Sequence, residues 1–435
     1  MHAIDELAMF VVSHKDGDLP QQARETCSLL VADLIGATAG GLNSQLAKAA
    51  RNASEQIFGP GQADVWLTGP ALSIAGAAMA NAAAASALDI DDGHRGAAGH
   101  AGAGIIPAVL AIGQALNVSD QRIFDALALG YDVGLRVASA RPTPTIETYA
   151  SGRWVNYGVA AAAGWMLGLN ALQLAHALGI AGAEGPIGST SGSTVKEMIP
   201  PAVVAGLTAA FRAKAGGTGP RDLLDRDELF KRSVLTGGLG ERWLLQDCYL
   251  KPYACCRYMH AAVDGILALR HSGKPINSLR IETFARGLKL ANERAPETLE
   301  AGQYSYYFSC ALAALRGAAA LQPVDPESLR DPEVLSLAAR IELAAHEDFD
   351  NTFPNSTPCR VILDQGEGPQ SLTVPFPLGD VANPMNRQQV AAKFRQIAAA
   401  NLDADRQHEI LFALERLTDD GFRPLFSSLR ARPGH

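Results

Sequence analysis

From the N-terminus to about residue 270, apolar residues recur every three or four positions along the chain. An apolar repeat with this period places one face of an α-helix against a core. Glycine and proline separate the repeats, and alanine dominates their apolar positions, so the pattern predicts a large all-helical domain whose small side chains let helix axes approach closely. The repeat is clearest in Ile105–Leu116, Ile123–Ala138, Gly158–Leu169 and Ala202–Ala215.

After Leu269 the pattern changes to an alternation of apolar and polar residues. Alternation of this kind places successive side chains on opposite faces of a β-strand. A segment with helical spacing, Phe308–Ala320, lies between the alternating ones. We therefore expect residues 271–384 to form a smaller α+β domain. The alternating segments are Ser278–Leu290, Arg340–Ala345, Cys359–Leu363 and Ser371–Phe376.

Helical spacing returns at the end of the chain, in Arg387–Ala399 and His408–Arg416. We expect these helices to pack against the first domain. A chain of 435 residues also exceeds the size at which a single core stops growing. The predicted fold is mostly α, with a large helical domain formed by residues 1–270 and 385–435.

Composition narrows the class of protein. Hydrophobic residues make up 48% of the chain and the formal net charge is −8, without a basic stripe, so a nucleic-acid partner is not expected. The six cysteines form no CxxC pair, which disfavours a zinc ribbon and fits a reducing compartment. No stretch resembles a signal peptide or a membrane span. We expect a soluble, cytoplasmic protein without a membrane partner.

The first cluster of chemically active residues lies between Asp89 and His100. Three carboxylates, two imidazoles and a guanidinium fall within these twelve positions, in a glycine-rich loop that precedes a helix. Imidazole titrates near neutrality, so His94 or His100 could move protons while Asp89 orients them. Asp92 and Arg95 are candidates for substrate binding.

Two other interpretations of this loop stay open. A capped helix end with solvated charges is the plainest. The other is a metal site, for which the candidate ligands are Asp91, Asp92, His94 and His100.

The second cluster runs from Lys251 to His260 and reads Lys-Pro-Tyr-Ala-Cys-Cys-Arg-Tyr-Met-His. Cys256 and His260 are four residues apart, which would place them on one face if the helix begins by Cys256. Lys251 and Arg257 could hold a carboxylate or lower the pKa of the thiol. A buried cysteine pair with a core histidine is the alternative, and a Cys–His nucleophile pair would lack an assignable orienting residue.

Three further residues are candidates for substrate binding. Lys196 follows the flexible run Gly188–Thr194 and could reach a carboxylate. Arg153 precedes a predicted helix and could line a cleft. Tyr306 belongs to an aromatic group at the start of another predicted helix, where core packing is the alternative.

In this order along the chain, the two clusters resemble the hallmarks of the MmgE/PrpD family. The first is the Asp-x-Asp-Asp-Gly-His-Arg loop followed by Gly-His, and the second is Lys-Pro-Tyr-x-Cys-Cys-Arg-x-x-His. The resemblance extends over nearly the whole chain. It includes Ser151-Gly152, Gly217-Thr218-Gly219-Pro220, Leu378-Gly379-Asp380 and Lys393-Phe394.

The resemblance implies a fold and a chemistry. The family has a large helical domain with a smaller α+β lid, usually forms homodimers and requires no cofactor. Its activities, which include 2-methylcitrate dehydratase, cis-aconitate decarboxylase and iminodisuccinate epimerase, act on small di- or tricarboxylates by reaction at a carbon beside a carboxylate. Asp89 and His100 correspond to the family's acidic and histidine active-site positions, and Lys251 to its cleft lysine.

Three departures separate this chain from the decarboxylase form of the family. Cys256 stands where decarboxylase-type members have a histidine, Gly152–Gly158 lacks a histidine, and Phe308 takes the place of an active-site tyrosine. The pattern is closer to the epimerase-type branch. Three classes remain: a cofactor-independent lyase or isomerase, a metal-dependent hydratase or hydrolase, and a non-catalytic carboxylate-binding protein.

Overall fold

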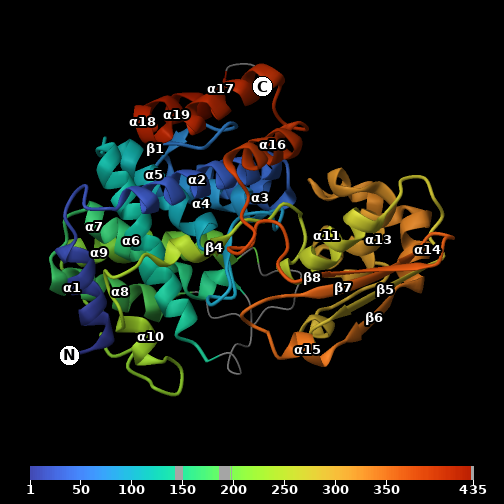
Figure 1. Cartoon of the computed structure of the whole chain (residues 1–435). Coiled ribbons are helices and arrows are strands. Elements are labelled where there is room, and N and C mark those ends of the chain that lie inside the picture. The colour runs from blue at the N-terminus through green and yellow to red at the C-terminus, as the bar shows by residue number, and fades with distance from the viewer. Residues whose placement is uncertain (143–149, 186–195, 197, 433–435) are drawn as a thin grey trace.

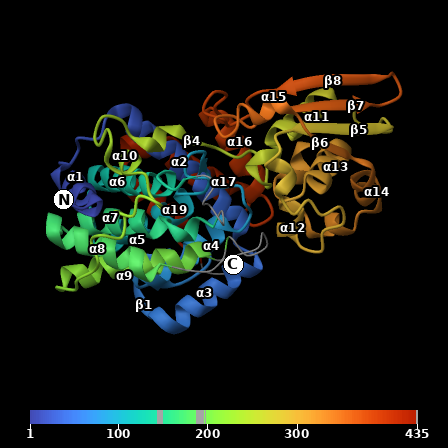
Figure 2. The same ribbon diagram turned by 90° about the horizontal axis from the view of Figure 1, so that it is seen from below.

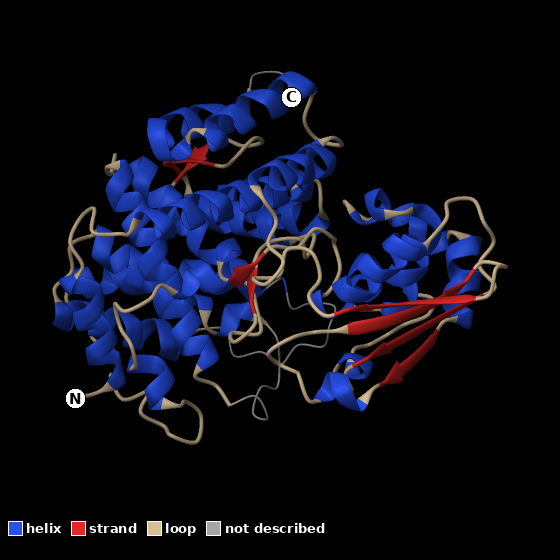
Figure 3. Cartoon of the chain, viewed as in Figure 1, coloured by secondary structure: helices blue, strands red, loops and turns tan. Residues whose placement is uncertain are grey.

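Helices form most of the first half of the chain in the computed structural model (Figures 1 and 3). The structure describes residues 1–142, 150–185, 196 and 198–432. The helices of this part are α1 (Ala3–Ser13), α2 (Gln21–Gly41), α3 (Gln45–Phe58), α4 (Ile74–Ser86), α5 (Gly102–Ala115), α6 (Asp120–Ser139), α7 (Val155–Met166), α8 (Ala171–Glu184), α9 (Ile199–Lys214) and α10 (Arg232–Thr236). Two short antiparallel strand pairs join them, β1 (Pro60–Asp64) with β2 (Ala71–Leu72) and β3 (Gly93–His94) with β4 (Cys248–Tyr249).

Small side chains bring the helices of this domain close together, as the alanine- and glycine-rich pattern predicted. Helices α6 and α7 meet where Gly158 faces Gly130. A Cβ atom at Gly158 would lie only 2.5 Å from the carbonyl oxygen of Gly130. A residue larger than glycine would therefore push the two helices apart and open the core.

The smaller part of the fold is a four-stranded sheet with helices on one face (Figures 1 and 2). The strand order is β6-β5-β7-β8, parallel between β5 and β6 and antiparallel elsewhere. Buried and more exposed residues alternate along β5 and β7, so one face of the sheet lies against the core. The strands are β5 (Ser278–Thr283), β6 (Glu342–Ala345), β7 (Cys359–Asp364) and β8 (Pro369–Val374).

This architecture confirms the predicted fold class, a mostly α protein with a smaller α+β part. The expected strand Ser278–Leu290 is shorter than its alternation suggests. It ends at Thr283, and the side chain of Asp350 accepts the hydrogen bond of the Ala285 N–H at 2.5 Å. The remaining helices are α11 (His260–Leu269), α12 (Leu299–Gln303), α13 (Tyr306–Arg316), α14 (Pro332–Arg340), α15 (Glu347–Asp350), α16 (Arg387–Ala398), α17 (Ala404–Glu415), α18 (Leu417–Asp420) and α19 (Phe422–Leu429).

Two large hydrophobic clusters form the cores of the helical part and of the sheet in the described part of the chain. Helix α11 packs on β7, β8 and α13, and its Val263 and Ile266 belong to the same apolar cluster as Val361 of the sheet. The smaller core therefore includes residues 253–269. At the C-terminus, α16 packs on α2, and Phe394 and Phe422 lie in the core of the helical part.

No helix in the described part of the chain is both long and apolar enough to cross a bilayer.

Candidate active site

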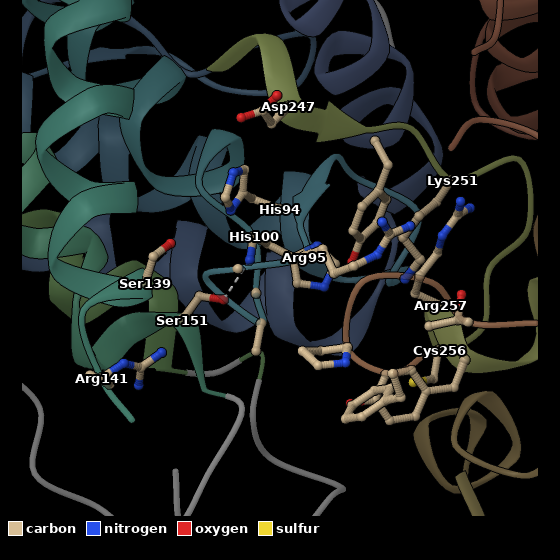
Figure 4. A pocket seen from close by; sticks show the side chains of 18 of the residues that line it. His94, Arg95, His100, Ser139, Arg141, Ser151, Asp247, Lys251, Cys256 and Arg257 are labelled. Atoms are coloured by element: carbon tan, nitrogen blue, oxygen red, sulfur yellow. Dashed lines mark hydrogen bonds between the residues drawn. The ribbon is translucent and has the colours of Figure 1, made fainter. Parts of the chain in front are cut away.

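The pairing of β3 with β4 brings the two predicted clusters together. Gly93 pairs with Tyr249 and His94 with Cys248, so the Asp-rich loop lies beside the segment that leads to Lys251. Gly93 is required here, because a Cβ atom would lie 2.5 Å from the Tyr249 hydroxyl. A cavity of about 530 Å³ opens beside this pair and is lined from both sides (Figure 4).

Asp89 is the centre of a buried ion-pair network in this cavity. Its Oδ2 lies 2.8 Å from the Lys251 Nζ, and its Oδ1 contacts the Lys196 Nζ and lies 3.4 Å from the His100 Nε2. Burial alone would raise the pKa of Asp89, but the two ammonium groups and the imidazole hold it below its usual value. Asp89 is therefore a carboxylate that fixes the cationic side chains around it.

The backbone at Asp89 adopts a left-handed conformation, with φ +52°. This region is sparsely populated for residues other than glycine and is retained only where the surroundings enforce it. The side chain of this residue is paired with Lys196 and Lys251, and the next carbonyl, that of Ile90, accepts a hydrogen bond from the Lys393 Nζ.

His100 is oriented by the loop on which it lies. Its Nδ1 is 2.8 Å from the Asp92 carbonyl oxygen and 3.2 Å from the Asp91 Oδ2, two acceptors that favour a proton on Nδ1. The Nε2 lies 3.4 Å from the Asp89 Oδ1, and the ring lines the cavity. The His100 backbone N–H donates to the Ser151 Oγ at 2.8 Å, which anchors the loop (Figure 4).

His94 also lines the cavity but is held in the opposite tautomer. Its Nδ1 accepts a hydrogen bond from the Ala97 backbone N–H at 3.1 Å, so the neutral ring carries its proton on Nε2. Burial, together with the charges of Arg242 and Arg95, lowers the pKa of His94 to about 4. His94 is therefore a neutral hydrogen-bond donor at pH 7 rather than a base.

Cys256 and Tyr304 supply protonated groups to the same cavity. Burial and the nearby Asp89 carboxylate raise the pKa of the Cys256 thiol to about 11 and that of the Tyr304 hydroxyl well above its usual value. Both groups are thus neutral acids at pH 7. The sequence suggested an activated thiolate for Cys256, whereas its surroundings favour a thiol.

The carboxylate of Asp380 holds two arginines at the cavity wall. Arg257 donates to the Asp380 Oδ2 at 3.1 Å, and Arg95 donates to the same oxygen and to the Asn355 carbonyl. The Arg257 guanidinium also lies 4.6 Å from the centre of the Tyr249 ring. Both predicted arginines therefore line the cavity with fixed orientations.

The described lining carries six basic side chains and two acidic ones. The basic residues are Arg95, Arg141, Lys196, Lys231, Lys251 and Arg257, and the acidic residues are Asp89 and Asp247. Asp247 is paired with Arg242, which lies outside the lining. The cavity is thus suited to an anionic ligand although the whole chain is acidic.

Of the predicted site residues, eight line this cavity: Asp89, His94, Arg95, His100, Lys196, Lys251, Cys256 and Arg257. The Gly188–Thr194 run that precedes Lys196 lies outside the described residues.

Four other predicted residues do not border the cavity, and their assignments need correction. His260 is fully buried, with its ring packed on Tyr253 and its Nε2 3.1 Å from the Cys255 carbonyl oxygen. Asp92 points into the helical core, where it accepts a hydrogen bond from the Tyr131 hydroxyl at 3.3 Å.

The other two are Tyr306 and Arg153. Tyr306 is fully buried and donates to the Tyr258 carbonyl oxygen at 2.5 Å. Arg153 is partly buried in the short 3₁₀ turn that begins with the lining residue Ser151, and it is not itself among the described lining residues. Phe308 is buried in the smaller core, and Tyr304, four residues earlier, lines the cavity.

Several lining residues were not singled out from the sequence as site residues. They include Ser139, Arg141, Lys231, Tyr249 and Tyr304. A carbonyl-capping arginine just after a helix and a tyrosine beside other aromatics are common surface and core features, so neither carries a sequence signal of its own.

The donors for a metal are partly present. Asp89, Asp91 and His100 each offer a ligand atom, and these atoms lie within 4.8 Å of one another. However, both Asp89 oxygens contact lysine ammonium groups, and Lys196 lies 4.0 Å from Asp91. A divalent cation would be placed against two positive charges, so this donor set fits an ion-pair network better than a metal site.

Fold and cavity together define a class of mostly helical protein with a smaller α+β part and a cation-lined cavity. The model of the MmgE/PrpD N-terminal domain matches residues 5–241, and that of the MmgE/PrpD C-terminal domain matches residues 253–419. The chain therefore belongs to the MmgE/PrpD family, which confirms the resemblance seen in its motifs.

Curated relatives are similar over most of their length. Cis-aconitate decarboxylase of Aspergillus terreus (strain NIH 2624 / FGSC A1156) is 26% identical over 446 residues, which cover 92% of this chain and 91% of the relative. The cis-aconitate decarboxylases of Homo sapiens and Mus musculus are 25% and 24% identical over 374 residues, with 79% of this chain covered in both cases and 76% and 75% of the relatives.

Proposed function

We propose that this protein is a cofactor-independent lyase or isomerase that moves a proton at a carbon beside a carboxylate of a small di- or tricarboxylate. The observation that carries the proposal is the buried network of Asp89, Lys196, Lys251 and His100, which opens on a cavity with an excess of cations. The names of the curated relatives describe a reaction on a small tricarboxylate, which supports the same substrate class.

Substrate carboxylates bind to the cations of the network. Removing a proton beside a carboxylate moves negative charge onto the carboxylate oxygens. Lys196 and Lys251 are already fixed by Asp89 and need little reorganisation to stabilise that charge. Arg95 and Arg257, which Asp380 holds in place, bind a further carboxylate of the same molecule.

His100 acts as the base. Its Nδ1 is held by the Asp92 carbonyl and the Asp91 carboxylate, and in the proposed step its Nε2, beside Asp89, takes the proton. The imidazolium that forms is stabilised by Asp91 and Asp89, its two carboxylate neighbours.

Cys256 and Tyr304 are the candidate acids. A proton returned to the reacting carbon from the face opposite His100 would invert its configuration, as in a racemase or epimerase. A proton given instead to a neighbouring hydroxyl would release water, as in a dehydratase. The presence of a thiol where decarboxylase-type members carry a histidine favours these two outcomes over decarboxylation.

The test is ¹H and ¹³C NMR of the protein with citrate, aconitate, malate and aspartate derivatives in D₂O. We expect deuterium to enter at one carbon beside a carboxylate. Inversion without mass loss would identify an epimerase, loss of water a dehydratase, and loss of CO₂ a decarboxylase. Saturable binding without exchange or turnover across the panel would favour the non-catalytic alternative and contradict the proposal.

Substitutions separate the roles of the site residues. We expect His100→Ala to reduce kcat by about 10²- to 10⁴-fold, the usual contribution of a general base. Lys251→Ala should lower kcat/KM to a similar degree, whereas Arg212→Ala, on the exposed side of α9, should leave both unchanged. Near-normal kcat/KM in both site variants would remove this assignment. Full loss of turnover on exhaustive chelation would favour the metal-dependent alternative.

We also propose that the protein forms a homodimer, as the family resemblance implies. Sedimentation velocity at several concentrations would test this assembly.

A further inference from the structure

The cavity has two ends that differ in chemistry. Lys251, Cys256 and Arg257 lie on one side, whereas Ser139 and Arg141 lie on the other (Figure 4). Ser139 is the last residue of α6, and Arg141 lies two residues further on. A volume of about 530 Å³ falls within the range of sites that hold drug-sized ligands, so the cavity has room beyond the reacting carbon.

Arg141 carries a charge that no described carboxylate neutralises. Its Nε and one terminal nitrogen donate to the carbonyl oxygens of Ala138 and Ala97, both at 3.0 Å. These bonds use two of the five guanidinium N–H groups. Burial and the charge of Arg153 lower the pKa of Arg141 to about 10, so the side chain stays charged at pH 7. A cation in such surroundings is stabilised by an anionic ligand.

Other donors gather at the same end. The Ser139 Oγ is buried and has no hydrogen-bond partner among the described residues, and it lies beside Gly96 and His94. The His94 Nδ1 accepts the Ala97 N–H, so Nε2–H is the donor of the neutral ring. Lys231 adds an ammonium group, whereas Asp247 is paired with Arg242.

We propose that Ser139, Arg141, Lys231 and His94 form a carboxylate-binding subsite at the end of the cavity away from Lys251 and Arg257, which selects substrates whose distal carboxylate lies several bonds from the reacting carbon. This inference rests on the proposed function, because Asp89, Lys196 and Lys251 hold the carboxylate beside that carbon. The preferred substrate is then an elongated di- or tricarboxylate, and short diacids fill only one end.

The test is isothermal titration calorimetry with malonate, glutarate, adipate and tricarballylate. For the wild type we expect the longest acids to bind at least tenfold more tightly than malonate, the gain of one charge-assisted hydrogen-bonded contact. Arg141→Gln should weaken the long acids about tenfold and leave malonate unchanged. Arg212→Gln, an exposed arginine paired with Glu184, is the matched control and should change none of them.

Two results would overturn the subsite. Arg141→Gln could match Arg212→Gln for every acid, or it could weaken malonate as much as adipate, which would indicate a general field rather than a subsite. A third result would also overturn the subsite: inorganic phosphate could bind while adipate is bound, and its binding could depend on Arg141. A free anion, rather than a substrate carboxylate, would then occupy the Arg141 end of the cavity.

Further variants keep the test independent of folding and of turnover. If Arg141→Gln loses its folded circular dichroism spectrum, Lys231→Gln, at an exposed position, and Ser139→Ala should each weaken adipate and not malonate. Calorimetry requires no reaction. If the protein exchanges no proton in D₂O but Arg141→Gln still weakens adipate selectively, only the proposed function is contradicted. If it exchanges a proton but Arg141→Gln does not weaken adipate selectively, only the subsite is contradicted.

Discussion

The protonation of His94 links the site to the stability of the fold. The pKa of this side chain is lowered from 6.5 to about 4, chiefly by burial. Between these pH values the unfolded chain binds a proton that the folded chain does not. The free energy of unfolding should therefore fall as the pH drops from 6.5 to 4, by up to about 3 kcal/mol from this residue.

Urea denaturation at several pH values measures this effect. We expect His94→Gln to give a shallower loss of stability between pH 6.5 and 4 than the wild type. His408→Gln, at an exposed position on α17, should keep the wild-type slope. Identical slopes in His94→Gln and the wild type would show that His94 is protonated in the folded protein and is not the neutral donor inferred above.

At the scale of single residues, the motifs indicated which residue types gather at the site better than they indicated where each side chain points. Asp89, His100 and Lys251, which the family pattern assigns to the active site, lie within one ion-pair network. His260 does not share a face with Cys256, because α11 begins only at His260 and residues 257–259 form a 3₁₀ turn. The i,i+4 rule applies only inside a helix.

The choice between Tyr304 and Tyr306 has a similar cause. Tyr304 lies in the turn between α12 and α13 and faces the cavity, whereas Tyr306 begins α13 and faces the core. Two residues of sequence separation give no indication of side-chain direction where the backbone is neither a regular helix nor a strand.

At the scale of elements, α16 supports the active-site loop from behind. The Lys393 Nζ donates to the Asp33 Oδ1 of α2 at 2.6 Å and to the Ile90 carbonyl at 2.7 Å, between Asp89 and Asp91. Lys393→Met would leave the buried Asp33 carboxylate unpaired. We expect a loss of about 3–5 kcal/mol in the free energy of unfolding, measured by urea denaturation.

The double variant Lys393→Met/Asp33→Leu distinguishes support of the loop from simple charge balance. Removing both charges should restore most of the stability, because no buried charge remains unpaired. The kcat should stay low, because the Ile90 carbonyl still lacks its donor and the left-handed turn at Asp89 loses that support. Recovery of both stability and kcat would mean that Lys393 only balances Asp33.

Regular elements were predictable because they repeat a pattern over many residues. The strands of the small sheet and the long helices follow directly from alternation and from helical spacing. The β3–β4 pair, which creates the site, spans two residues on each strand and joins positions more than 150 apart. Such a pair has no local pattern, so only the fold of the whole chain reveals it.

At the scale of the whole molecule, the overall charge and the local charge have opposite signs. The chain carries a net charge of −8, yet the described cavity lining holds six basic and two acidic side chains. Composition therefore gave no sign of a nucleic-acid partner and no sign of an anion site either. The sign of a cleft depends on which few residues the fold brings together.

This local charge predicts that polycarboxylates stabilise the folded protein. A ligand that binds only the folded state at 100 times its Kd adds about 2.7 kcal/mol to the free energy of unfolding. Tricarballylate should therefore raise the Tm in differential scanning fluorimetry. Sodium chloride at equal ionic strength should not, because chloride screens charges without occupying several cations at once.

Two variants connect this stabilisation to the proposed roles. His100→Ala removes the base but keeps the cations, so it should retain the ligand-induced rise in Tm while losing turnover. Lys251→Gln removes one of the two ammonium groups at Asp89 and should lose most of the rise. If His100→Ala lost the rise and Lys251→Gln kept it, the carboxylate would be bound by the imidazole. The proposed roles, in which Lys251 binds the carboxylate and His100 acts as the base, would then be wrong.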